Sequence, residues 1–211
     1  MLPEDGFMIV ATDVQSDLPS EFREALILVA VHGDEGSLGF VINRPSACPL
    51  LEAFEGLGVH TSTVDEPHPT VAAMSLVGSG FVKRRAGKRA EPHAFRGGRT
   101  RPDVGWLLFD TDGVPEPEDS CLLTPEIGVT AAPLAMADLV AAGGRSLLLL
   151  GHVTWDPGAL DQQIEQGSWM RMPADPRLVF ETPAERRWSD ATCTALGLPK
   201  PWLGLARFAT A

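Results

Sequence analysis

Polar side chains that could bind an anion or transfer a proton flank a predicted hairpin. In the segment VHGDEGSLGFVINRP, His32 ends one apolar run, and Asn43 and Arg44 finish the next run before Pro45. Because the two ends of a hairpin lie side by side, we expect His32 to lie near Asn43 or Arg44. A histidine beside an arginine and an asparagine can bind an anion or transfer a proton. The alternative is that Asn43 and Arg44 only satisfy backbone groups where the chain turns.

A second polar group lies where a predicted strand meets a predicted helix, in GHVTWDPGALDQQIEQGSW. His152, Thr154 and Trp155 are placed at the carboxyl end of an apolar run, where free N–H groups and a helix dipole favour anions. The alternative is a packed corner, in which Trp155 and Trp169 belong to the core and Asp156 only caps the helix.

Motifs with a known catalytic mechanism are absent from the sequence. There is no GxxxxGK[ST] loop, no GxGxxG between a strand and a helix, and no GxSxG elbow. Ser37 and Ser79 stand beside glycines, but both lack the full nucleophile pattern and are interpreted as turn residues. The five histidines lack HExxH or HxxxH spacing, and the three cysteines contain no CxxC pair. We therefore predict no catalytic residue, no metal site, no disulfide framework and no cofactor.

The charge of the chain is unevenly distributed. Its 211 residues include 17 basic and 28 acidic side chains, for a net charge of −11. Such a protein repels phosphate, which argues against general binding to nucleic acid or anionic membrane. No apolar run approaches the ~20 residues that cross a bilayer, so we expect a cytoplasmic protein. The segment 83–101 is the exception, with eight of the basic residues and one acid. Its first half is a candidate contact for an acidic partner, through Lys83, Arg84, Arg85, Lys88 and Arg89.

Hydrophobic patterning predicts an α/β (α+β) domain with a bent, largely antiparallel or mixed sheet and flanking helices. Hairpins come early in the chain, and strands alternate with helices late. Asp156 and Thr182 are the expected N-caps of the last two helices. Strands are expected over 7–11, 25–32, 38–44, 103–110, 120–130, 145–155 and 177–181, and helices over 49–57, 133–142, 157–167 and 183–197.

Several segments, in order over most of the chain, resemble the bacterial AlgH/YqgE family. They are NRP after the hairpin, the pair Gly97 and Gly98, the strand-to-helix segment around Trp155, and the tail PADPRLVFETPAERRWSDATCTALG. The resemblance implies a compact α/β domain on a strongly bent, bulged sheet, here a single domain over 1–211 with a basic insertion at about 60–95. It implies no agreed activity, and some members are labelled transcriptional regulators on genetic grounds. His152 stands where the family usually has Tyr, and Ala159 where it usually has Gln.

Three functions remain open on these observations. The first is a regulatory protein that binds another protein, with segment 83–101 as a contact. The second is a small-molecule or anion binder, or an unrecognised enzyme. The third is a nucleic-acid-binding regulator, which would depend on the basic loop alone. The candidate ligand residues of the second function are His32, Asn43, Arg44, Gly97, Gly98, His152 and Trp155.

Overall fold

The computed structural model of the protein describes residues 6–12, 18–59, 93–114 and 116–199. Its strands are β1 (Phe7–Ala11), β2 (Leu26–Gly33), β3 (Gly36–Val41), β4 (Pro45–Pro49), β5 (His93–Arg96), β6 (Thr100–Asp110), β7 (Ser120–Thr124), β8 (Ile127–Thr130), β9 (Ser146–Trp155) and β10 (Trp169–Pro173). Its helices are the short 3-10 helix η1 (Ser20–Phe22), α1 (Leu50–Gly56), α3 (Pro133–Ala142), α4 (Ala159–Glu165), α5 (Pro176–Phe180) and α6 (Ala184–Ala195).

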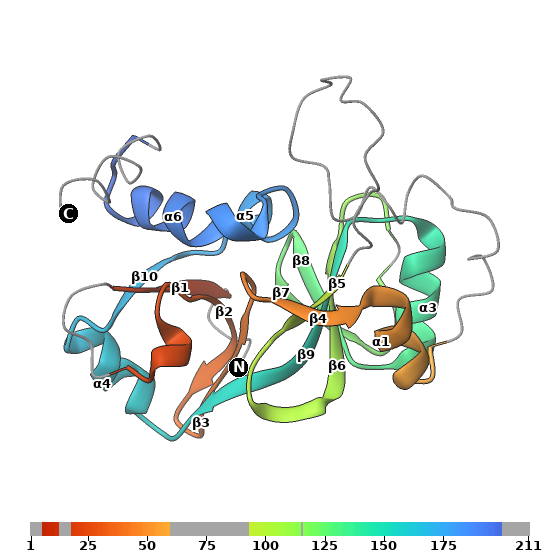
Figure 1. The fold of residues 1–211 in the computed structure, drawn as a ribbon, viewed down its shortest axis with the longest axis horizontal. Coiled ribbons are helices and arrows are strands. Elements are labelled where there is room, and N and C mark those ends of the chain that lie inside the picture. The colour runs from red at the N-terminus through yellow and green to blue at the C-terminus, as the bar shows by residue number, and fades with distance from the viewer. Residues whose placement is uncertain (1–5, 13–17, 60–92, 115, 200–211) are drawn as a thin grey trace.

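Strand β9 is the axis of the fold and joins the two halves of the sheet (Figure 1). Before Gly151 it pairs antiparallel with β6 on one edge and parallel with β5 on the other. Gly151 has a φ of +70°, a value that L side chains rarely adopt, and beyond it β9 pairs with β3. The described residues form a ten-stranded sheet in the order β10-β1-β2-β3-β9-β6-β8-β7, with β4 and β5 off this path.

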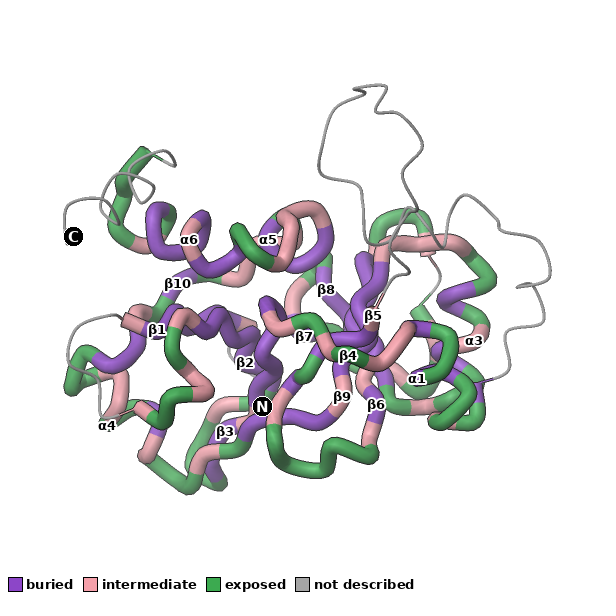
Figure 2. The backbone as a smooth tube through the Cα atoms, in the orientation of Figure 1, coloured by how far each residue is buried: buried purple, intermediate pink, exposed green. Residues whose placement is uncertain are grey.

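The first half of the sheet is buried on both faces (Figure 2). Successive strand residues point to opposite faces, so each face contributes to a different core cluster. Met8 and Leu28 pack in a cluster with α5 and α6, whereas Ile9 and Ile27 pack in a cluster with α4 and the η1 segment. Because helices cover both faces of these strands, successive residues must all be apolar. This explains the continuous apolar runs in the sequence.

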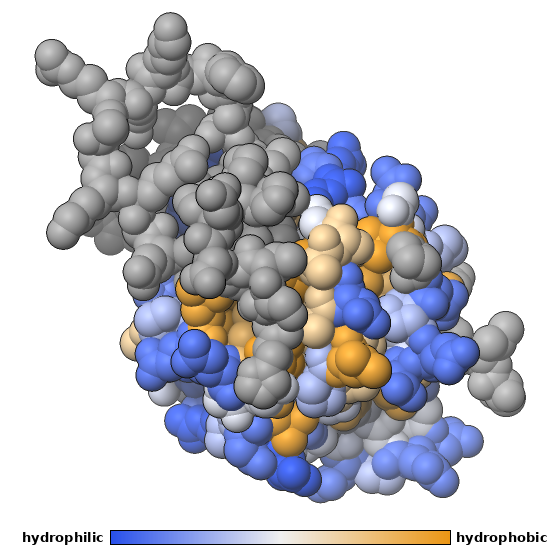
Figure 3. Space-filling model, turned by 90° about the vertical axis from the view of Figure 1, so that its right-hand side faces the viewer, coloured by the Kyte–Doolittle hydropathy of each residue, from blue (hydrophilic) through white to orange (hydrophobic). Residues whose placement is uncertain are grey.

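The second half of the sheet carries α1 and α3 on one face. Phe54 of α1 and Met136 of α3 share a core cluster with Phe109 of β6. Leu51 and Leu134 remain 44% and 74% exposed, and Figure 3, which views this end of the molecule, shows apolar side chains on its surface. None of the helices in the described ranges is long and apolar enough to cross a membrane.

The structure confirms the mixed α+β architecture with a bent, mainly antiparallel sheet, and it confirms most of the predicted elements. The predicted strands over 7–11, 25–32 and 145–155 and the predicted helices over 49–57 and 133–142 are all present with small shifts at their ends. Of the predicted basic insertion, residues 60–92 lie outside the described part of the chain, as do the five candidate partner-binding residues at 83–89.

Four predictions of local structure were wrong. Residues 177–181 belong to helix α5 and not to a strand, because Asp175 caps the helix by accepting a hydrogen bond from the Arg177 N–H at 2.9 Å. The run 120–130 is split into β7 and β8. Neither predicted N-cap is present. The N-cap of α4 is Gly158 and not Asp156. The N-cap of α6 is Pro183 and not Thr182, whose hydroxyl donates to the Arg177 carbonyl of α5. The sequence reasoning also missed η1, β4, β5 and β10.

Candidate functional site

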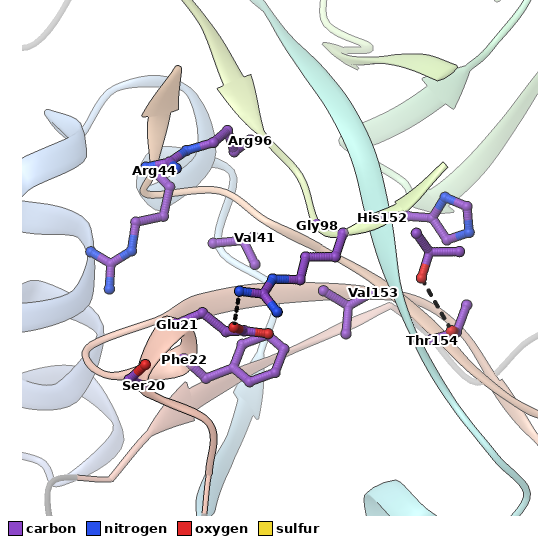
Figure 4. Close-up of a pocket in the computed structure, with 12 residues that line it drawn as sticks. Ser20, Glu21, Phe22, Val41, Arg44, Arg96, Gly98, His152, Val153 and Thr154 are labelled. Carbon is purple, nitrogen blue, oxygen red and sulfur yellow. Dashed lines mark hydrogen bonds and ion pairs between the residues drawn. The ribbon is translucent and has the colours of Figure 1, made fainter. Parts of the chain in front are cut away.

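A pocket of about 560 Å³ opens where β9 leaves one half of the sheet for the other (Figure 4). Its walls come from η1, the end of β3, the connection between β3 and β4, the end of β5 with the turn that follows it, and the second half of β9. These segments are far apart in the sequence, and the central position of β9 brings them together. The volume is in the range that holds a small organic molecule.

Two glycines hold the β5–β6 turn against β9 beside the pocket. The Gly97 N–H donates to the Leu150 carbonyl at 2.8 Å, and the Gly97 carbonyl accepts from the Val41 N–H at 2.8 Å. A Cβ on Gly98 would lie 2.1 Å from the carbonyl carbon and oxygen of His152. The pair is therefore required by the close approach of two backbones, and only Gly98 of the two lines the pocket.

Three arginines dominate the chemistry of the pocket. Arg44 and Arg96 lie on adjacent segments, because the Arg96 N–H donates to the Arg44 carbonyl at 2.8 Å. The Arg44 guanidinium donates to the Arg23 carbonyl, and the Arg99 guanidinium pairs with Glu21 at 2.6 Å. Arg96 forms no ion pair with any residue in the described ranges. Guanidinium groups in this number suit the oxygens of a carboxylate or a phosphate.

The remaining lining of the pocket is apolar side chains and hydroxyl groups. Phe22, Val41 and Val153 supply apolar surface. Thr100 and Thr154 face each other with 3.5 Å between their hydroxyl oxygens, on the side of β9 that also carries the His152 ring. The pocket thus has a charged side and an apolar side, which fits an amphipathic anion.

His152 borders the pocket with its backbone, while its imidazole lies on the other face of β9. Val153 faces the pocket, and strand alternation turns the neighbouring His152 side chain away, as Figure 4 shows. The ring packs edge-on against Trp106, with 5.8 Å between ring centroids, and its Nδ1 has no hydrogen-bond partner among the described residues. Burial lowers the pKa of His152 below its ordinary value, and the charge of Arg101 lowers the pKa further.

Acid is therefore expected to destabilise the fold partly through His152. The unfolded chain has the ordinary pKa of 6.5 and the folded chain a lower one, so between the two values the unfolded state binds more protons. This contribution to stability is complete above pH 6.5 and is lost as the pH falls through the folded pKa. In His152→Phe the free energy of unfolding, measured by urea titration, should fall less between pH 7.5 and acid than in the wild type. An unchanged pH dependence would contradict this.

His32 does not lie near Asn43 and Arg44. The register pairs His32 with Ser37 at the hairpin turn, whereas Asn43 and Arg44 follow the opposite end of β3. In a hairpin, residues beside the turn face each other, and residues at the far ends of the two strands face each other. His32 lies beside the turn and Asn43 and Arg44 lie at the far end, so they do not meet. His32 Nδ1 lies 2.8 Å from the Ser37 hydroxyl oxygen, and its Nε2 lies 3.3 Å from an Asp161 carboxylate oxygen.

Asn43 and Trp155 are also outside the pocket lining. The Asn43 side chain accepts from the Leu26 N–H at 3.0 Å and donates to the Glu24 carbonyl at 2.8 Å, which fits the alternative of backbone satisfaction. The indoles of Trp155 and Trp169 both donate to the Gln163 side-chain oxygen, at 3.1 and 2.9 Å, which fits the alternative of a packed corner.

Of the seven predicted ligand residues, the structure brings Arg44, Gly98 and His152 together at the pocket. The residues that sequence reasoning missed are those of η1, because the segment before β2 carries no regular pattern. Arg96 and Arg99 were visible as part of the basic segment, but nothing in the sequence separates them from its other charges.

Comparison with known proteins supports one relationship. Residues 7–199 match the model of the family described as AlgH-like. A UPF0301 protein of Anaeromyxobacter dehalogenans strain 2CP-1 is 28% identical over 189 residues, which are 88% of this chain and 84% of that protein. A UPF0301 protein of Xylella fastidiosa strain M23 is 27% identical over 172 residues, which are 81% of this chain and 78% of that protein.

Two solved structures share the fold. The solution structure of the AlgH protein from Pseudomonas aeruginosa gives a TM-score of 0.67 at 22% identity and covers 95% of this chain and 92% of that one. A crystal structure of a protein from Corynebacterium diphtheriae gives 0.60 at 20% identity and covers 91% and 87%. Neither protein is described with an activity. Because the family model spans nearly all the described residues, the chain belongs to the AlgH-like family, whose biochemical activity is not established.

Proposed function

We propose that this protein is a cytoplasmic regulatory protein that binds a small organic anion in the pocket between η1 and the β5–β6 turn. The observation that carries the proposal is the convergence of Arg44, Arg96 and Arg99 on one pocket of a protein whose net charge is −11. The overall field of such a protein repels anions, so a local cluster of guanidinium groups is a specific place for one.

The pocket supports binding better than catalysis. Among the described residues that line it, the one carboxylate is Glu21, which is paired with Arg99. The one imidazole, that of His152, is turned away from the arginines. A hydrolytic or proton-transfer site needs a base within hydrogen-bonding reach of the bound molecule, and this lining offers no free one.

The test is the binding of two small anions that carry an apolar ring, benzoate and phenyl phosphate, measured by isothermal titration calorimetry. At least one of them should bind the wild type, and Arg44→Gln should weaken that binding about 10-fold or more, since hydrogen bonds to charged groups contribute about 1.5–3 kcal/mol. The control is Arg177→Gln, which removes the same charge from an exposed position on α5 outside the pocket and should bind as the wild type does.

Two results would contradict the proposed function. One is the absence of binding of either anion at millimolar concentration. The other is an equal loss of affinity in Arg44→Gln and Arg177→Gln, which would mean that only the net charge matters. The melting temperature of each variant should be recorded, because Arg44 also donates to the Arg23 carbonyl.

We further propose that the regulatory partner is another protein. The support is the exposed apolar surface at the α1 and α3 end, which includes Leu51 and Leu134 (Figure 3). Nucleic acid is disfavoured by the net charge, except through the basic segment, and any such binding would weaken steeply with added salt.

A further inference from the structure

The charges that line the pocket define the charge of the ligand. Three arginines, Arg44, Arg96 and Arg99, and one carboxylate, that of Glu21, line the pocket, and the other lining residues in the described ranges are uncharged apart from the titratable His152. The imbalance is two positive charges. A monoanion would leave the pocket positively charged, whereas a dianion would neutralise it.

We propose that the ligand is a phosphate monoester with an apolar ester group, and that Glu21 is the residue that limits its affinity. This inference rests on the proposed function of the pocket as an anion site. A phosphate monoester carries close to two negative charges above its second pKa of about 6 and offers three acceptor oxygens. Several guanidinium groups can bind these oxygens at once.

The arginine side chains are arranged for such shared binding. Arg44 comes from the connection between β3 and β4 and Arg99 from the β5–β6 turn, yet both reach the η1 segment, where Arg44 contacts the Arg23 carbonyl and Arg99 contacts Glu21. Figure 4 shows the Arg44 side chain extending down toward the side of the pocket on which Ser20 and Glu21 lie. A phosphate bound there would lie between cations supplied by two separate segments.

The apolar ester group is indicated by the opposite wall. Phe22, Val41 and Val153 line it, and Phe22 is fixed in place by packing edge-on against Trp169, with 5.8 Å between ring centroids. Trp169 itself is 2% exposed. A flat apolar group can therefore pack on a rigid surface beside the charged side.

Glu21 occupies the place that a ligand oxygen would take on Arg99. The Arg99 side chain is 83% exposed and that of Glu21 is 30% exposed, so water and salt weaken their mutual attraction. A dianion that also contacts Arg44 can displace the Glu21 carboxylate from Arg99. In the ligand-free protein Glu21 therefore keeps Arg99 at the edge of the pocket, and in the complex the charge of Glu21 repels the bound anion.

Backbone strain marks the same two segments. The described residues other than glycine that have positive φ are Glu24, at 54°, and Arg101, at 48°. Glu24 lies two residues after η1, and Arg101 is the second residue of β6, next to the turn that carries Arg99. Residues held in this region cost free energy and concentrate beside ligand sites, so the strain supports the assignment of both segments to a binding site.

The experiment compares two probes of nearly the same shape at pH 8, phenyl phosphate as the dianion and methyl phenyl phosphate as the monoanion, by calorimetry on the full chain. The wild type should bind phenyl phosphate about 10-fold tighter, the effect of one further charge beside several guanidinium groups. Glu21→Gln should tighten phenyl phosphate binding about 3- to 10-fold, and methyl phenyl phosphate binding by less.

The matched control is Asp103→Asn. Asp103 also pairs with an arginine, Arg101, but it lies outside the pocket lining. The variant removes one negative charge, as Glu21→Gln does. It should change phenyl phosphate binding less than 2-fold. Equal effects of the two variants would overturn the role of Glu21. Equal affinity for the two probes would overturn the phosphate monoester. If Arg44→Gln bound either probe as tightly as the wild type does, the anion site itself would be overturned.

Discussion

Replacing Gly98 by alanine is expected to lower the free energy of unfolding by about 3 kcal/mol. The added Cβ would lie 2.1 Å from the carbonyl carbon and oxygen of His152 and 2.7 Å from the Val153 nitrogen. These are backbone atoms in the central strand, which cannot move aside as the tip of a side chain can. The β5–β6 turn would have to separate from β9, with loss of the hydrogen bond from Gly97 to the Leu150 carbonyl.

Thermal unfolding followed by circular dichroism measures this effect, and a chain of this length should lose about 6–12 °C in melting temperature. Gly56→Ala is the control. Gly56 is the last residue of α1, no atom lies within 4 Å of the position that its added Cβ would take, and alanine favours helix, so the melting temperature of this variant should be unchanged or slightly higher. If Gly98→Ala had the same melting temperature as the control, the backbone at Gly98 would not be in close contact with that of β9.

Replacing Trp169 by alanine should cost about 3–5 kcal/mol of stability, the range for truncating a buried aromatic side chain. The indole is 2% exposed, lies in the core cluster between β1, β2 and α4, and donates to Gln163 at 2.9 Å. It also supports Phe22 of the pocket wall. The variant should therefore bind phenyl phosphate more weakly at a temperature where it is still folded.

Urea titration of Trp169→Ala measures the loss, with Leu134→Ala as the control. Leu134 is also a large apolar residue, but it is 74% exposed, so its truncation should change stability by less than about 0.5 kcal/mol. Addition of indole should recover part of the stability of Trp169→Ala by filling the cavity. Equal stabilities of the two variants would show that Trp169 is not a core residue.

The sequence predicted elements well where one physical signal dominates. The apolar run of β2, the apolar run of β9, and the α3 segment between Pro133 and Gly143 have strong local patterns, and all three are present. The segment RLVFE shows the limit of such patterns. Its short apolar run suits a strand, but the Asp175 cap and Pro176 before it make it helical. Strand β5 has four residues, and its place beside β9 depends on tertiary contacts that no local pattern encodes.

The candidate site could be predicted only in part, for a related reason. Arg44 was identified from the hairpin pattern and the glycine pair from the family resemblance, but their convergence depends on the crossing of β9 between sheet halves at Gly151. His32 was misplaced because the register of the hairpin, and not its presence, decides which residues meet. Glu21 and Phe22 lie in a three-residue helix with no sequence signal of its own.

The most direct test of the anion site is a two-dimensional ¹H–¹⁵N NMR titration of the labelled wild-type protein with phenyl phosphate at pH 8. The largest amide shift changes should occur at residues 20–23, 44, 96–101 and 152–154, the segments that border the pocket. The same titration of Arg44→Gln should need much higher phosphate ester concentrations. Shift changes centred on another part of the molecule, or none at millimolar concentration, would show that this pocket is not an anion site.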